Sequence, residues 1–155
     1  MLQNKYSIDV SIGMLLKKTG MTHEFFMQTR LEPGPFFGML EFPGGKIELG
    51  ESALQAMRRE WSEEVVEILG QQFFSPIARW HAFPVLIHDY PDRRVALHPF
   101  YTIIQDHDNL VHKSVLPEPF QWIDSKNFDR QKIIPASLPI IDSLMNLIPN
   151  LLPPK

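Results

Sequence analysis

The first part of the chain alternates between apolar and small or polar positions. Every second residue over 6–16 is apolar, and Ser11 and Gly13 are among the residues between them. A period of two is typical of a strand with one face towards a core. We therefore predict a half-buried strand over 6–16, a turn over 17–20 and a returning strand over 24–30.

The rest of the chain predicts a loop, one long helix, further strands and a last helix. Prolines and glycines over 31–40 indicate the loop. Apolar runs predict strands over 73–82, 85–89, 95–104 and 121–123. Pro99 lacks a backbone donor, so it requires an edge position or a bulge. The apolar spacing over 140–148 predicts a packed C-terminal helix.

The long helix is delimited at both ends. Ser52 and Gln55 form a capping-box pattern, so the helix is expected to begin at Ser52, and Gly70 is a natural stop. At about 100° per residue, one arc collects the apolar side chains expected to face the core. They are Leu54, Met57, Trp61, Val65, Ile68 and Leu69.

A second arc of this helix is acidic. Glu60, Glu63, Glu64 and Glu67 follow the spacing i, i+3, i+4, i+7, at which like charges repel by a few tenths of a kcal/mol per pair. A solvated helix face is the ordinary interpretation of such a run. Just before the helix, however, Gly44-Gly45 allows the backbone to approach an ion or a phosphate closely. Carboxylates are preferred by Mg²⁺, so the pattern favours metal-assisted phosphoryl chemistry.

Composition excludes several classes of protein. A chain of 155 residues fits one domain, taken as 1–155 with a tail over about 146–155. With 44% hydrophobic and 21% charged residues, it is not a disordered chain. A net charge of −3 argues against stable binding to nucleic acid. No apolar run reaches membrane-spanning length, and without cysteine neither disulfides nor thiolate chemistry is available, so we expect a cytoplasmic location.

The segment from Gly45 to Glu64 resembles the Nudix box. Gly45 is followed after five residues by Glu51, and after seven more by Arg59-Glu60 and then Glu63-Glu64. Every charged position of the pattern matches at the correct spacing. The match departs at its end, where the family glycine is Val66 and the next apolar position is Glu67. We interpret this departure as a helix extended to Gly70.

Flanking segments resemble the MutT-type 8-oxo-dGTP diphosphatases of this family. These segments are 40–48, with Glu41 and Phe42, then 90–93, with Tyr90 and Arg93, and 134–139. Arg30, eleven residues before Glu41, stands where such proteins carry a nucleotide-contacting arginine. At Ser137 the subfamily has an asparagine that hydrogen-bonds the oxidised guanine edge. A hydroxyl lacks the planar fork of an amide, so weaker 8-oxo discrimination is expected.

The resemblance implies a fold, a metal site and a substrate. The fold is an α/β/α sandwich with a mixed sheet between helices. Glu60, Glu63 and Glu64, with the Gly44 carbonyl, hold Mg²⁺ or Mn²⁺. Arg59 orients the carboxylates, and the general base is either Glu60 or Glu118. The expected substrate contacts are Arg30, Glu41, Phe42, Tyr90, Arg93 and Ser137.

The implied activity is hydrolysis of an (oxidised) purine nucleoside triphosphate to a monophosphate and pyrophosphate, a step in DNA repair. Two alternatives stay open: a Nudix hydrolase for another nucleoside diphosphate derivative, such as 5′-triphosphorylated RNA or a nucleotide sugar, and a non-catalytic nucleotide-binding module. The apolar segment 147–152 covers either a partner subunit in a homodimer or the chain's own core.

Overall fold

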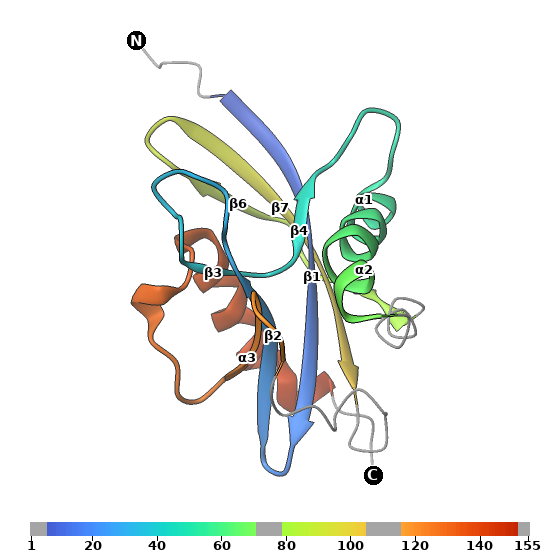
Figure 1. Ribbon diagram of the computed structural model, residues 1–155, viewed down its shortest axis with the longest axis vertical. Helices are drawn as coiled ribbons and strands as arrows, with labels where there is room; N and C mark the ends of the chain where they lie inside the picture. Colours follow the sequence, from blue (N-terminus) through green and yellow to red (C-terminus); the bar gives the residue numbers. More distant parts are fainter. Residues whose placement is uncertain (1–5, 71–78, 105–115, 152–155) are drawn as a thin grey trace.

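The computed structural model describes residues 6–70, 79–104 and 116–151. An eight-stranded mixed sheet lies between helices, with α1 (Ala53–Trp61) and α2 (Glu67–Leu69) on one face and α3 (Leu138–Leu151) on the other (Figure 1). The expected α/β/α sandwich with a mixed sheet is confirmed.

The sheet is centred on one parallel strand pair, β1 beside β7. Its main order is β3-β2-β1-β7-β5, while β4 pairs with β1, β6 with β7 and β8 with β2, all antiparallel. The strands are β1 (Tyr6–Thr19), β2 (Thr22–Thr29), β3 (Leu40–Glu41), β4 (Gly44–Lys46), β5 (His81–Ala82), β6 (Leu86–Asp89), β7 (Arg93–Ile104) and β8 (Phe120–Asp124). Part of the strand predicted over 73–82 lies outside the described residues.

β1 differs from the predicted half-buried strand in its length and burial. It continues through the expected turn to Thr19, and residues 11–17 are buried on both faces of the sheet. Ser11 and Gly13 face α1 instead of solvent. The Ser11 hydroxyl donates to the Ala53 carbonyl oxygen at 2.6 Å, and a Cβ on Gly13 would lie 3.1 Å from the Trp61 ring. The alternating small residues therefore let the helix pack closely on the sheet.

The central helix begins where the sequence predicts, but it contains an interruption that the sequence did not indicate. The Ser52 and Gln55 capping box is present, and Gly70 ends the helix with a φ of 102°. Between α1 and α2, however, residues Ser62–Val66 form a π-helical turn. The extra residue of a π turn shifts the phase of everything after it. For this reason Ile68 is 57% exposed, against prediction, and Val66 is buried instead.

Pro99 lies in the interior strand β7 in unbroken register with Ile12 of β1, so of the two expected positions the edge is wrong. On the side of β5 and β6 the ladder is interrupted as in a bulge, because residues 83–85 face only residues 98–99. Its carbonyl accepts the Phe83 N–H at 2.9 Å, in the interval between β5 and β6. The N–H and the carbonyl of a strand residue point to the same side. The N–H that proline lacks would therefore point into this interval, where the pairing of β7 with β5 and β6 requires no hydrogen bond from it.

The C-terminal segment packs one face of α3 against the sheet. Ile140, Ile141, Leu144 and Ile148 are buried, whereas Leu147 is 40% exposed. At least Ile148 of the apolar segment thus covers the chain's own core. Immediately before α3, a short 3-10 turn (Pro135–Ser137) places Ser137 beside the pocket described next.

Candidate active site

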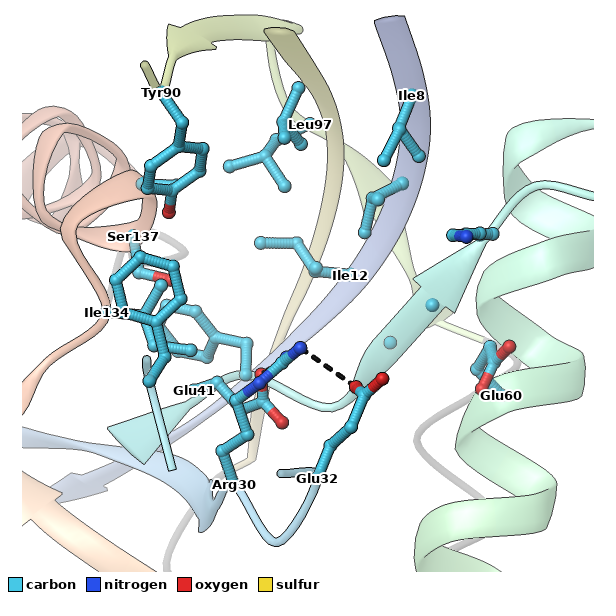
Figure 2. A pocket seen from close by; sticks show the side chains of 18 of the residues that line it. Ile8, Ile12, Arg30, Glu32, Glu41, Glu60, Tyr90, Leu97, Ile134 and Ser137 are labelled. Atoms are coloured by element: carbon cyan, nitrogen blue, oxygen red, sulfur yellow. Dashed lines mark hydrogen bonds and ion pairs between the residues drawn. The ribbon is translucent and has the colours of Figure 1, made fainter. Parts of the chain in front are cut away.

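A pocket of about 500 Å³ opens between the two helical layers. In Figure 2, Tyr90, Ile134 and Ser137 lie on one side of it and Glu60 on the other, with Arg30 and Glu32 between them. The residues predicted to contact substrate all line it, namely Arg30, Glu41, Phe42, Tyr90, Arg93 and Ser137. Gly44, Glu60 and Glu64 line it as well.

On the acidic side, strand β4 is held tightly between β1 and the central helix. A Cβ on Gly44 would collide with the backbone of Ser11, and a Cβ on Gly45 would collide with the Glu60 carboxylate. The Gly44 N–H donates to Glu64 Oε2 at 3.1 Å. The two glycines therefore allow the backbone to touch both carboxylates, from a strand that the sequence did not predict.

Gln28 is a site residue that the sequence did not reveal. Its Nε2 donates to Glu64 Oε2 at 3.1 Å, and its side chain also hydrogen-bonds Glu41. It is buried on β2, in register with Glu41 of β3. A lone glutamine in an apolar strand carries little signal, and its partners are 13 and 36 residues away. Only the folded sheet brings it between the two carboxylates.

Burial controls the electrostatics of the acidic side. It raises the pKa of Glu64 to about 7, with Glu60 and Glu41 contributing in the same direction and the bonds from Gln28 and Gly44 opposing the shift. Burial also raises the pKa of Glu41, although the Arg30 guanidinium opposes that shift. Carboxylates crowded in this way favour a bound cation, because it offsets both desolvation and mutual repulsion.

Arg59 joins the helix to the loop after β4. Its Nε and Nη2 donate to both oxygens of Glu51 at 3.2 and 2.7 Å, and its Nη1 donates to Glu60 Oε1 at 2.9 Å. Nη2 also reaches the Lys46 carbonyl oxygen at 3.1 Å. The Arg59 guanidinium holds the pKa of Glu51 below its usual value. One side chain thus fixes Glu60 relative to the loop.

The other side of the pocket is aromatic and apolar. The Tyr90 ring lies 5.3 Å from the Phe36 ring, and the Arg93 guanidinium lies 5.0 Å from the Tyr90 ring centre. The backbone of Ala136 hydrogen-bonds the Tyr90 hydroxyl, whose pKa is raised by burial. Ser137 is buried at the same wall. Such a wall offers a flat apolar surface with a few polar groups, which suits a planar ring.

Some predicted residues lie apart from the pocket. The Glu63 side chain is 56% exposed and 3.7 Å from Arg59 Nη1, and Glu118 is exposed on the loop before β8. Neither lines the pocket. Across residues 6–70, 79–104 and 116–151, no three acidic or histidine side chains are grouped closely enough to hold a metal ion. The four-glutamate arc is therefore divided, with Glu60 and Glu64 inward and Glu63 and Glu67 outward.

Comparison with known proteins decides the family. A model of the NUDIX domain matches residues 8–142. This chain belongs to the Nudix family. It is a Nudix hydrolase, a member of a pyrophosphohydrolase family, whose enzymes typically use a divalent metal ion and act on nucleotide substrates. Among its described residues, no helix is long and apolar enough to cross a membrane.

The chain also has distant relatives in the subfamily that its flanking segments resemble. The chain is 29% identical to the 8-oxo-dGTP diphosphatase of Escherichia coli (strain K12) over 140 residues, covering 90% of this chain and 98% of the relative. It is 25% identical to the Haemophilus influenzae 8-oxo-dGTP diphosphatase, covering 92% and 95%. Among solved structures, a Caenorhabditis elegans Ap4A hydrolase complex has a TM-score of 0.64 at 17% identity, covering 93% and 99%, which shows the shared fold.

Proposed function

We propose that this Nudix hydrolase is a divalent-metal-dependent nucleoside triphosphate diphosphatase. Its substrate is a purine (d)NTP, including the oxidised form, and its products are a nucleoside monophosphate and pyrophosphate. One observation carries the proposal: a single pocket combines the inward carboxylates Glu60 and Glu64 with an aromatic wall and with the cationic Arg30 and Arg93. The distant 8-oxo-dGTP diphosphatase relatives support the choice of substrate.

The donor chemistry of the acidic side fits Mg²⁺ or Mn²⁺. The proposed ligands are the inward carboxylates of Glu60 and Glu64 and the Gly44 carbonyl, all of them hard oxygen donors. Glu63 is the further proposed ligand, and its exposed side chain would have to turn inward from Arg59 to join them. Burial and the neighbouring carboxylates raise the pKa of Glu64, so binding a cation there removes an unfavourable charge arrangement. When bound, the metal neutralises phosphate charge and polarises the phosphorus to be attacked.

The protein side chains are proposed to bind the phosphates, to orient Glu60 and to accept the proton. Arg30, Lys46 and Arg93 line the pocket, and their proposed role is to pair with phosphate oxygens. Arg59 keeps the Glu60 carboxylate oriented, and Glu60 is the proposed base that takes a proton from the attacking water. The new bond joins the water oxygen to phosphorus, and the bridging P–O bond breaks to release pyrophosphate. Glu118 is the alternative base, although it is exposed and outside the pocket.

The experiment is a hydrolysis screen with Mg²⁺ or Mn²⁺. It compares dGTP, 8-oxo-dGTP, ATP, 5′-triphosphorylated RNA and a nucleotide sugar, each with and without excess chelator. We expect monophosphate and pyrophosphate from the purine triphosphates and no turnover in chelator. A specificity constant that is highest for RNA or for the nucleotide sugar would replace the proposed substrate with that one. Binding of nucleotides without turnover of any of them would identify a non-catalytic module.

A further inference from the structure

The guanidinium of Arg30 is held between two carboxylates of unequal exposure. Its Nη1 lies 2.9 Å from Glu41 Oε2, and its Nη2 lies 2.8 Å from Glu32 Oε2, the contact drawn in Figure 2. The Glu41 side chain is 22% exposed and also receives a hydrogen bond from Gln28, so it belongs to the pocket wall. The Glu32 side chain is 71% exposed. Glu32 is therefore the partner that can leave.

Glu32 begins a loop whose base is fixed by backbone bonds. The Arg30 N–H donates to the Met39 carbonyl oxygen at 2.8 Å, and the Gly38 N–H donates to the Arg30 carbonyl oxygen at 2.9 Å. Within the described part of the chain, Arg30 is the one hydrogen-bond partner of the Glu32 carboxylate. Release of this carboxylate therefore breaks one contact and leaves the base of the loop intact.

The charges along the pocket make this contact consequential. Three cationic side chains line it, those of Arg30, Lys46 and Arg93, against the four carboxylates of Glu32, Glu41, Glu60 and Glu64. A phosphate that approaches Arg30 from the pocket finds both sides of the guanidinium already occupied by carboxylates. An anion pairs with this side chain only by taking the place of one of them.

We propose that Glu32 is an intramolecular competitor, which occupies the outer side of Arg30 until an anionic group of the nucleotide displaces it. The proposal rests on the proposed function for the identity of that nucleotide. Glu32 is a positioning residue in this role, because it acts through Arg30. A competitor of this kind weakens every ligand that uses Arg30 by the same factor, since only the released fraction of the protein binds. It therefore raises the KM for the triphosphate and the Kd for the monophosphate product by the same factor.

The experiment compares the parent protein with Glu32→Gln and with Glu67→Gln. The second variant is the matched control, because Glu67 is exposed outside the pocket and its loss changes net charge by the same amount. The measurements are the Kd for dGMP and the KM and kcat for dGTP with Mg²⁺. We expect Glu32→Gln to lower Kd and KM by one common factor of roughly two to five, the range for an exposed ion pair, with kcat unchanged. Glu67→Gln leaves all three unchanged.

Two further measurements separate competition from a general charge effect. In an Arg30→Gln background the gain from Glu32→Gln disappears, because there is no guanidinium left to release. The gain also shrinks as salt rises, because salt screens the exposed pair. Thermal unfolding checks that each variant is folded.

Several results would overturn the proposal: equal dGMP affinity in parent and Glu32→Gln, an equal gain in Glu67→Gln, persistence of the gain without Arg30, or no dGMP binding in any variant. Failure of the proposed function looks different. In that case no triphosphate is turned over, while the gain in dGMP affinity and its dependence on Arg30 are still observed.

Discussion

The two sides of the pocket are built in different ways. On the acidic side, Glu60 and Glu64 are each held by hydrogen bonds of 2.9–3.1 Å, from Arg59 to one and from Gly44 and Gln28 to the other. On the aromatic side, Tyr90, Phe36 and Arg93 meet mainly through ring contacts at 5.0–5.3 Å. Ring contacts constrain orientation less than hydrogen bonds do. We therefore expect changes on the acidic side to reduce turnover and changes on the aromatic side to redirect specificity.

The largest effect is expected from Glu64→Gln. The substitution keeps the shape of the side chain and removes one charge from the proposed metal site. Charge stabilisation by a metal amounts to several kcal/mol, and each 1.4 kcal/mol is tenfold in rate, so kcat falls roughly a hundredfold or more. The measurement is kcat for dGTP with Mg²⁺, together with the melting temperature. An active variant that melts several degrees lower would instead make the acidic side structural.

Arg59→Lys tests whether orientation of the acidic side matters as much as its charge. Lysine keeps the positive charge but cannot bind Glu51 bidentately while also reaching Glu60 and the Lys46 carbonyl. Losing such a supporting contact lowers activity by about tenfold to a hundredfold. Arg58→Lys is the matched control, because Arg58 is exposed on the same helix. Equal activities of the two variants would show that charge alone suffices.

The neighbouring glycines separate folding from function on the acidic side. A Cβ on Gly45 meets the end of the Glu60 side chain, whereas a Cβ on Gly44 meets the backbone of β1. The Gly45→Ala protein is therefore expected to stay folded. Its activity should fall by about tenfold, because the new Cβ displaces the Glu60 carboxylate and losses of this size follow when a supporting contact is disturbed. Gly44→Ala is expected to lower the melting temperature, because a strand has no room to move. Circular dichroism melts and dGTP turnover distinguish the two, and identical behaviour would contradict the geometry.

These residues also show how much of the site can be predicted from the sequence. Glu60, Glu63 and Glu64 stand out in the sequence because they repeat on one helix, and the capping box and Gly70 delimit that helix correctly. The π-helical turn was not foreseen, because nothing in the run Ser62–Val66 departs from ordinary helical composition. It is the reason that Ile68 points outward and that the fourth glutamate of the arc, Glu67, is exposed.

Local sequence patterns do not predict contacts between segments that are far apart in the chain. Pairing of β4 with β1 joins residues more than 30 positions apart, so no local pattern predicts a strand at Gly44-Gly45. Gln28 was overlooked for the same reason. On the aromatic side, the segments 90–93 and 134–139 were singled out only by resemblance. The structure adds that both line one wall with Phe36, a residue that no pattern had marked.

The smallest effect is expected at Ser137, on the aromatic side, and it concerns choice of substrate. Oxidised guanine gains a donor at N7 beside the O6 acceptor, and an amide can pair with both, whereas a hydroxyl satisfies one. Asp142, on the helix that follows Ser137, does not supply the missing contact, because Arg130 binds its carboxylate at 2.8 and 2.9 Å and it does not line the pocket. The Arg93 carbonyl is already used by the Tyr90 N–H at 2.8 Å.

Ser137→Asn is accordingly expected to raise the preference for 8-oxo-dGTP over dGTP by about tenfold, the value of one buried hydrogen bond. The measurement is the ratio of the two kcat/KM values in parent and variant, with Ser143→Asn as a control on the exposed face of α3. Because the acidic side is untouched, kcat for dGTP should change little. A parent that already prefers the oxidised nucleotide by many thousandfold, with no gain in the variant, would show that Ser137 does not contact the base. Recognition would then have to come from another part of the aromatic wall, with Tyr90 and Phe36 the next residues to vary.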